Sequence, residues 1–227
     1  MKRFISWIFV LTFWFFNLFS FANDVRIWLK IQDFSANKHT IKIYYKILPD
    51  NNPQKFVWVN HPFFNPSYEP NDLVKLQWLS HISSQSHQQL RIEASQNLEN
   101  LANAFYNEFK TNIVIASAYR SYIYQKSSIS ESCKKSWRCA KEWESEHQLG
   151  LAVDLREATN EEKFLSKYQK YYYRLHDNAH LYWFHQSYQN GKEIDGYYAE
   201  PRHRRYLWKD LATKLHEENI TFTQYIN

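Results

Sequence analysis

Glycine is unusually scarce in this chain of 227 residues, which contains only three. Glycine is the residue that adopts a left-handed or crowded backbone at least cost. One of the three lies inside the segment Ser145-Glu146-His147-Gln148-Leu149-Gly150-Leu151-Ala152-Val153-Asp154. In a chain with so few glycines, this position indicates a backbone requirement at Gly150 rather than chance.

Cysteine is rarer still, and the two cysteines, Cys133 and Cys139, lie close together in a polar segment. No second cysteine pair or nearby histidine cluster accompanies them, so a metal site is the weaker interpretation. If the protein is exported to an oxidising compartment, we expect the two to form a disulfide. A cysteine hydrolase that uses either thiol with a histidine would then be excluded.

A strong net charge is also lacking. The formal charge is +5, and loss of Lys2 and Arg3 with an N-terminal signal would lower it to +3. Proteins that bind nucleic acid through charge carry a much larger positive excess. The sequence therefore gives no reason to expect a nucleic-acid partner.

The N-terminus has the pattern of a secretory signal. Lys2 and Arg3 precede an almost wholly apolar run over residues 4–16, and Ser20-Phe21-Ala22 places small residues at −3 and −1. We expect cleavage after Ala22. The alternative is an uncleaved membrane anchor, because residues 4–22 are just long enough to span a bilayer. In both cases the protein is expected in the periplasm or cell envelope.

The rest of the chain is long enough for one substantial domain. We predict a signal peptide over 1–22, an extension over 23–56 and a main domain over 57–227. In the extension, residues 25–31 and 40–47 largely alternate apolar and polar side chains. This pattern favours two half-buried strands, which we expect to form a β-hairpin.

Periodicity in the main domain predicts helices and strands together, an α+β fold. Apolar steps of three and four residues indicate a helix over 88–109 and a second near the C-terminus over 208–215. Short apolar runs over 113–116 and 150–155 are typical of buried strands. A capping-box pattern over 159–162 predicts another helix, extending through residue 180. Asn190-Gly191 is a strong hairpin signal, with its second strand expected over 196–199.

Two motifs, Ser145–Asp154 and Glu200-Pro201-Arg202-His203, offer the parts of a catalytic zinc site. Such a site needs three protein ligands, an open position for water and a separate base for that water's proton. We expect His147, Asp154 and His203 to be the ligands and Glu200 to be the base. Pro201 biases Glu200 away from the α region, so the second motif should be extended rather than helical.

A competing histidine pair lies further along the chain. His176 and His180 have the i, i+4 spacing of a helical zinc motif, but Asp177 stands where that motif places its glutamate base. No third ligand is obvious downstream. We interpret these histidines as structural.

The two motifs, together with Ser117-Ala118-Tyr119-Arg120-Ser121-Tyr122, resemble the three signatures of the VanY-type zinc D-alanyl-D-alanine carboxypeptidases, in the family's order. These enzymes belong to the LAS metallopeptidase group and trim peptidoglycan stem peptides. The resemblance runs from about Val57 to Tyr225. It implies a small antiparallel sheet that carries the Zn2+ site and is flanked by helices.

The resemblance also implies roles for three further residues. In the family, the arginine that matches Arg120 holds the substrate carboxylate or the developing oxyanion, two tasks that suit a guanidinium. A surface ion pair is the alternative for this residue. Gln125 and Ser145 match positions near the peptide substrate, although either side chain could instead cap a helix or stabilise a loop.

Two positions depart from the family pattern. Ala118 stands where glycine is usual, and Arg202 stands where tryptophan is usual. With Arg204 and Arg205, Arg202 is expected to form a basic rim. We expect such a rim to favour a substrate with an additional carboxylate.

The implied activity is removal of the terminal D-alanine from stem peptides by a secreted enzyme. An L,D-carboxypeptidase and a peptidoglycan endopeptidase remain open, because cleft shape beyond the metal distinguishes them. A cell-wall-binding protein without turnover is the alternative of another class. The four chemically competent positions at the zinc site argue against it.

Overall fold

The computed structural model describes residues 45–227 apart from residue 60 and residues 159–161, and only the backbone of residues 158 and 162–167. The predicted signal peptide, most of the predicted hairpin and the start of the capping box lie outside the described residues. Residues 45–47 are described and are helical, so the strand prediction is wrong at its end. No described helix has the length and apolar character needed to cross a membrane.

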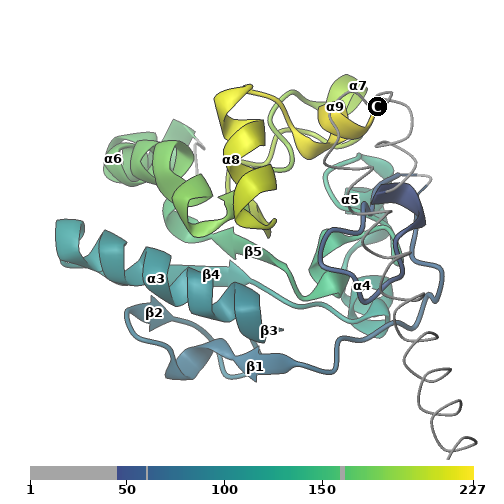
Figure 1. Ribbon diagram of the computed structural model, residues 1–227, viewed down its shortest axis with the longest axis horizontal. Helices are drawn as coiled ribbons and strands as arrows, with labels where there is room; N and C mark the ends of the chain where they lie inside the picture. The colour runs from purple at the N-terminus through teal and green to yellow at the C-terminus, as the bar shows by residue number, and fades with distance from the viewer. Residues whose placement is uncertain (1–44, 60, 159–161) are drawn as a thin grey trace, which may run out of the picture. The chain divides into compact units, whose positions relative to one another are not determined.

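The described residues form one five-stranded sheet and a separate strand pair (Figure 1). In the sheet the strand order is β2-β4-β5-β7-β6, and only the β2–β4 pairing is parallel. The antiparallel pair is β1 with β3. The strands are β1 (Leu73–Lys75), β2 (Ile82–Ser83), β3 (Gln89–Arg91), β4 (Ile113–Ser117), β5 (Ala152–Leu155), β6 (Phe184–His185) and β7 (His203–Tyr206).

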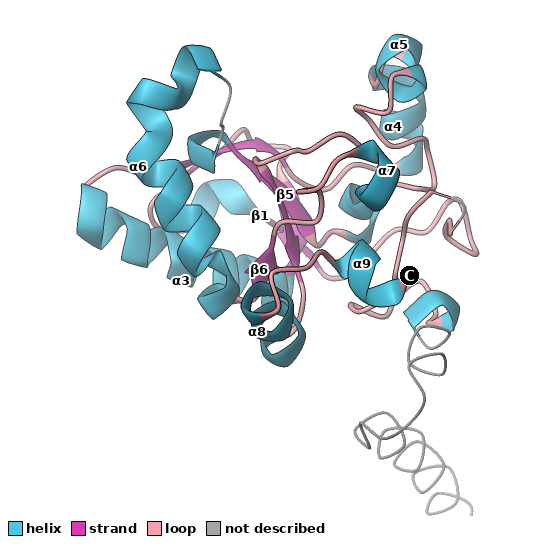
Figure 2. Ribbon diagram, turned by 90° about the horizontal axis from the view of Figure 1, so that it is seen from above, coloured by secondary structure: helices cyan, strands magenta, loops and turns pink. Residues whose placement is uncertain are grey.

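Helices cover both sides of this sheet, with α3 and α6 on one side and α4, α5, α7 and α9 on the other (Figure 2). The α-helices are α3 (Ile92–Phe109), α4 (Tyr122–Ser128), α5 (Glu131–Lys135), α6 (Glu162–Asn178), α7 (Lys192–Asp195), α8 (Lys209–Glu217) and α9 (Phe222–Ile226). The 3-10 helices are η1 (Leu76–Trp78), η2 (Glu146–Leu149), η3 (Arg156–Ala158) and η4 (Ala179–Tyr182). The predicted fold class, α+β with a small sheet flanked by helices, is confirmed.

The predicted amphipathic helices are present, with one shifted start. α3 buries an apolar face at three- and four-residue steps, and α8 does the same near the C-terminus. However, the first helix begins at Ile92 rather than Gln88, because Gln89–Arg91 pair with β1. Leu90 in that strand is fully buried. Strand pairing therefore takes the residues that periodicity assigned to the helix.

The predicted hairpin at Asn190-Gly191 is wrong. The carboxylate of Asp195 accepts hydrogen bonds from the backbone N–H groups of Gln189 (2.8 Å) and Asn190 (2.6 Å). This contact closes the turn, and the chain then continues into α7. Residues 196–199 form no strand.

β5 and β7 carry the functional part of the sheet. All four residues of each strand are buried, although β7 has the polar sequence His-Arg-Arg-Tyr. The two strands pair so that Asp154 lies directly opposite His203. Residues 49 positions apart in sequence are therefore neighbours in the sheet.

Candidate functional site

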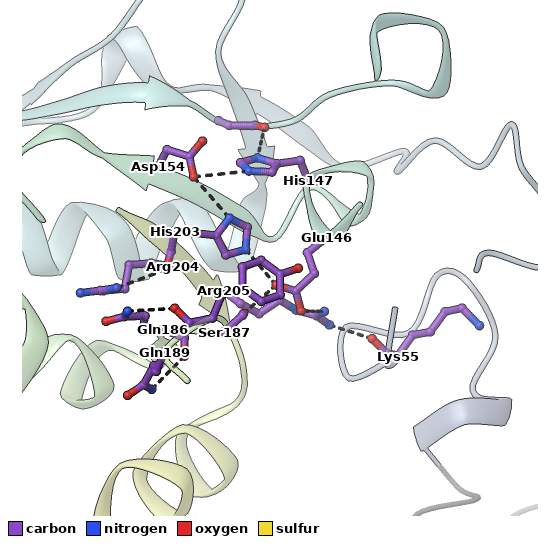
Figure 3. Close-up of polar contacts among 12 residues, drawn as sticks. Lys55, Glu146, His147, Asp154, Gln186, Ser187, Gln189, His203, Arg204 and Arg205 are labelled. Atoms are coloured by element: carbon purple, nitrogen blue, oxygen red, sulfur yellow. Dashed lines mark hydrogen bonds and ion pairs between the residues drawn. The ribbon is translucent and has the colours of Figure 1, made fainter. Parts of the chain in front are cut away.

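The three predicted ligands lie together in a buried group (Figure 3). Asp154 Oδ1 is 3.4 Å from His147 Nε2 and 3.3 Å from His203 Nδ1. One possible ligand atom from each residue lies within 4.8 Å of the others. In the part of the chain that the structure describes, no other group of three or more His, Cys, Asp or Glu residues has this geometry.

Gly150 brings His147 next to the strand that carries Asp154. It ends η2 in the left-handed region with φ +67°, and its N–H donates to the carbonyl of His147 (3.1 Å). A Cβ atom there would lie 2.9 Å from Leu73 Cδ2. The expected backbone requirement is confirmed, since both the dihedral angle and the close approach favour glycine.

His147 is held in one tautomer. Its Nδ1 lies 2.6 Å from the carbonyl oxygen of Ala118, which can only accept, so Nδ1 donates and Nε2 keeps its lone pair. Burial lowers the pKa of His147 to about 4, and the charge of Arg120 adds to this effect. The neutral imidazole with a free Nε2 is the form that binds a metal ion.

His203 lies between two carboxylates. Its Nε2 is 2.8 Å from Glu146, and its Nδ1 faces Asp154. Burial alone would lower the pKa of His203, but the hydrogen bonds to Asp154 and Glu146 outweigh it and raise the pKa to about 9. With Nε2 donating to Glu146, Nδ1 is the atom presented to Asp154 and His147.

Glu146 was not predicted as a site residue, yet it anchors His203. Its carboxylate also accepts hydrogen bonds from Ser187 Oγ (2.6 Å) and Arg205 Nη1 (2.8 Å). Burial alone would raise the pKa of Glu146, but Arg205 and the hydrogen bonds lower it to about 2. The sequence offered one signal for an acidic partner here. Strand alternation places His203 and Arg205 on the same side of β7, where a buried arginine requires a carboxylate.

Glu200, the expected base, precedes β7. Its carbonyl accepts a hydrogen bond from the His203 N–H (3.1 Å), so residues 200–203 form a turn and the expected extended conformation is wrong. The side chain is half-buried. Burial and the charge of Asp154 raise the pKa of Glu200 above its ordinary value. A carboxylate with a raised pKa is better suited to take a proton near neutral pH.

Arg120 lies beside the same group, three residues after the end of β4. Its backbone N–H donates to the carbonyl of His147 (3.3 Å). Its charge adds to the lowering of the His147 pKa and partly opposes the rise in the Glu200 pKa. Its Nε is buried without a partner among the described residues. The guanidinium thus has unsatisfied hydrogen-bonding capacity at the site.

The other two predicted substrate contacts are buried. The side-chain N–H of Gln125 donates to the carbonyl of Ala140 (2.6 Å), the residue directly after the disulfide Cys133–Cys139. The predicted disulfide is therefore present. Ser145 is 2% exposed and immediately precedes η2. The substrate contacts of Gln125 and Ser145 stay predictions.

The expected basic rim is wrong for two of its three members. Arg204 is 1% exposed and Arg205 is fully buried, so neither can reach a substrate at the surface. Arg202 alone stays half-buried, in the turn before β7. The buried guanidiniums instead donate to backbone carbonyls, and Arg205 also pairs with Glu146.

The second histidine pair does not join a metal group among the described residues. α6 ends at Asn178, so the predicted helix is two residues too long, and His180 lies in η4. The ring of His180 stacks on His216 with the ring centroids 3.7 Å apart. His176 instead contacts Asp177 at 2.9 Å.

The buried His-Asp-His group fits zinc. Two imidazole nitrogens and one carboxylate oxygen make up the three-ligand set of catalytic zinc sites, which keep one position open. Carboxylate and carbonyl partners fix both rings, as is usual around metal-bound histidines. An acid and an arginine lie beside the group, so the arrangement can support hydrolysis of an amide bond.

Comparisons with known proteins agree with this chemistry. The family VanY, D-alanyl-D-alanine carboxypeptidase, matches residues 87–209. "Putative carboxypeptidase YodJ" of Bacillus subtilis (strain 168) is 34% identical over 191 residues, which cover 77% of this chain and 68% of that protein. The solved structure of the LD-carboxypeptidase LdcB, which addresses peptidoglycan recognition, matches with a TM-score of 0.64 at 30% identity. The match covers 78% of this chain and 86% of the LdcB chain.

Two solved structures of VanY proteins are also similar to this chain. The D,D-pentapeptidase VanY in complex with Zn(II) has a TM-score of 0.58 at 24% identity and covers 81% of this chain and 99% of its own. VanYB in complex with D-alanine-D-alanine has a TM-score of 0.57 at 26% identity, with coverages of 76% and 96%.

Fold and site thus define a small α+β peptidase domain. The chain belongs to the VanY family of D-alanyl-D-alanine carboxypeptidases and is a carboxypeptidase that acts on peptidoglycan.

Proposed function

We propose that this protein is a secreted, zinc-dependent carboxypeptidase that removes the terminal D-alanine from peptidoglycan stem peptides. The observation that carries the proposal is the buried group of His147, Asp154 and His203 with Glu200 and Arg120 beside it. VanY, a protein of the same family, is solved both with Zn(II) and with D-alanine-D-alanine.

The mechanism assigns one task to each residue. His147 Nε2, Asp154 and His203 Nδ1 would hold a zinc ion, which would polarise the scissile carbonyl and lower the pKa of a bound water toward ~7. Glu200 takes the proton of the attacking water and gives it to the leaving nitrogen as the C–N bond breaks. Arg120 holds the terminal carboxylate or stabilises the oxyanion through charge-assisted hydrogen bonds.

Substitution at Glu200 tests this assignment. Glu200→Gln should retain one zinc ion per chain and lose nearly all turnover, because the amide cannot take the proton. Glu217→Gln, which changes an exposed acid on α8, is the matched control. Metal content is measured on the purified protein, and released alanine by mass spectrometry. A Glu200→Gln variant that still turns over would overturn the assignment, as would a metal-free protein that ignores added zinc.

An L,D-carboxypeptidase is the second candidate, favoured by the likeness to LdcB. The residues around the zinc position do not separate the two activities, because the cleft beyond the metal selects the bond. Stem peptides that end in D-alanyl-D-alanine and stem peptides that end in a single D-alanine separate them directly. Loss of one alanine from the first alone supports D,D cleavage, and loss from the second alone supports L,D cleavage. Conversion of cross-linked dimers to monomers would indicate an endopeptidase instead.

We also propose export across the cytoplasmic membrane, to the periplasm or cell envelope. The disulfide Cys133–Cys139 supports this, since such bonds persist in oxidising compartments. N-terminal sequencing of the protein from fractionated cells tests the cleavage site. A mature chain that begins at Asn23 agrees with cleavage after Ala22, whereas an intact N-terminus in the membrane fraction indicates an anchor.

A further inference from the structure

A small cavity lies next to β7, outside the proposed zinc group. It has a volume of about 50 Å³ and is bordered by the end of α6, by η4, by β6 and by α8. Its polar lining residues include His176, His180, His185, Gln186, Arg204 and His216. Because side chains alternate along a strand, Arg204 and His203 point to opposite sides of β7. In Figure 3 the guanidinium of Arg204 points away from the ring of His203.

Arg204 is a buried charge without a counter-ion. It is 1% exposed, and its Nη1 donates to the carbonyls of Pro201 (2.6 Å) and His203 (3.2 Å). Its Nη2 is buried with no partner, and no carboxylate in the described part of the chain pairs with it. An uncompensated buried charge is strongly destabilising. The other buried arginine of the strand, Arg205, does have an anionic partner in Glu146.

Further unsatisfied groups belong to the same lining. His185 Nε2, His180 Nδ1 and Gln186 Oε1 are all buried without a hydrogen-bond partner in the described residues. His185 is 5% exposed, whereas His180 and His216 are half-buried and lie beside each other. Gln186 Nε2 donates to the carbonyl of Tyr188 (3.1 Å), which leaves Oε1 as the free end of the amide. The lining thus offers one positive charge, imidazole nitrogens and one acceptor.

The charge and hydrogen-bonding groups of the lining distinguish a metal cation, water and an oxyanion as possible occupants of the cavity. A metal cation is disfavoured by the charge of Arg204, and the histidine nitrogens do not form a metal group among the described residues. Water could satisfy the hydrogen bonds but not the charge. A cavity of about 50 Å³ holds a few non-hydrogen atoms. Gln186 Oε1 requires a donor, which an oxyanion supplies only if it carries a proton.

We propose that this cavity binds one small protonated oxyanion, of the hydrogen phosphate or bicarbonate class, with Arg204 as its counter-charge. The guanidinium Nη2 donates to the anion, and His185 Nε2 provides a second contact. The O–H of the anion donates to Gln186 Oε1.

Calorimetric titration of the mature, zinc-loaded protein tests the proposal. Sodium phosphate, bicarbonate and sulfate are titrated separately, in a buffer that contains chloride as its sole other anion. Phosphate, bicarbonate or both should bind at one saturable site per chain, and the comparison shows which is preferred. Sulfate, which has no proton to donate at neutral pH, should bind at least about tenfold more weakly. Equal affinity for sulfate would overturn the assignment of a protonated anion.

Two variants locate the anion. Arg204→Met keeps the side-chain length but removes the charge, so it should weaken phosphate binding by at least about tenfold. Arg120→Gln lies at the proposed catalytic site, on the other side of β7, and should leave this binding unchanged. The opposite result, with Arg204→Met neutral and Arg120→Gln defective, would place the anion at the zinc site and refute the proposal.

A stability measurement and a third variant guard against failure to fold. In phosphate-free buffer Arg204→Met should have a Tm at or above that of the wild type, because the uncompensated charge is gone. If Arg204→Met does not fold, His185→Phe keeps the ring and removes the second contact. This variant should lose phosphate affinity while it retains one zinc ion per chain, and wild-type affinity in it would count against the site.

Discussion

Replacement of Glu146 by glutamine removes a charge that holds His203 in place. The carboxylate is 4% exposed and accepts hydrogen bonds from His203, Ser187 and Arg205. Breaking a buried ion pair costs about 3–5 kcal/mol. Arg205 keeps two other acceptors, the carbonyls of residues 53 and 55, at 3.0 and 2.9 Å. We therefore expect Glu146→Gln to lower the free energy of unfolding by about 3 kcal/mol, the lower end of that range.

Glu146→Gln should also weaken zinc binding. Loss of a carboxylate that orients a metal-bound histidine lowers metal affinity by about 10–100-fold. Competition with a chromogenic chelator measures the zinc dissociation constant, and urea unfolding in the presence of a chelator measures stability without metal. Imidazole ¹⁵N spectra of the zinc-loaded protein report the tautomer of His203, which should carry its proton on Nε2 in the wild type.

Ser187→Ala is the matched control for Glu146→Gln. It removes one hydrogen bond to the same carboxylate and leaves the charge, so the loss of stability should be about 1 kcal/mol. Zinc affinity should change far less than in Glu146→Gln. The reasoning is refuted if Glu146→Gln binds zinc as tightly as the wild type, or if both variants lose the same affinity.

Three further predictions concern positions around the site. Gly150→Ala should destabilise the protein by about 1–2 kcal/mol or more, because the left-handed backbone and the close packing both oppose a Cβ atom; an unchanged urea midpoint would contradict this. Burial lowers the pKa of His185 to about 3. As the pH falls, the His185 ring is therefore protonated in the unfolded chain before it is protonated in the folded one. This group contributes its full stabilisation above pH ~6.5, and the free energy of unfolding falls by about 1.4 kcal/mol per pH unit from there toward pH ~3. His185→Phe should show a smaller loss between about pH 7 and about pH 5 in phosphate-free buffer, and equal losses would argue against this pKa. Finally, serine at both Cys133 and Cys139 should cost about 2 kcal/mol of stability in the chain-entropy model. Urea unfolding measures this cost, and a variant as stable as the wild type would show that the disulfide adds nothing.

The sequence predicted well what local patterns determine. The apolar steps of α3 and α8 and the strand after residue 112 follow from spacing, although that strand is only partly buried. The requirement at Gly150 followed from the scarcity of glycine, and the small sheet flanked by helices followed from the family resemblance. The structure also brings His147, Asp154 and His203 into one group, whose role as zinc ligands stays a prediction. Spacing could suggest this meeting but not the strand register that produces it.

Two of the misses come from side-chain hydrogen bonds that hydrophobic periodicity does not reveal, one short in range and one long. Asp195 closes the turn at residues 189–190 and cancels the hairpin, although the dipeptide there favours one. Glu146 takes His203 and Arg205 as partners from almost sixty positions away, which turns an expected surface arginine into a buried one. Side-chain hydrogen bonds across such separations leave no periodic trace in the sequence.

Because Asp154 pairs directly with His203, metal binding depends on the correct register between β5 and β7. A shift of one residue between β5 and β7 would turn one of the two side chains to the opposite face. On the proposed zinc chemistry, such a mispaired chain would hold the ion poorly, and correctly paired molecules would be stabilised by mass action. Zinc would then favour the correct strand register during folding as well as take part in hydrolysis.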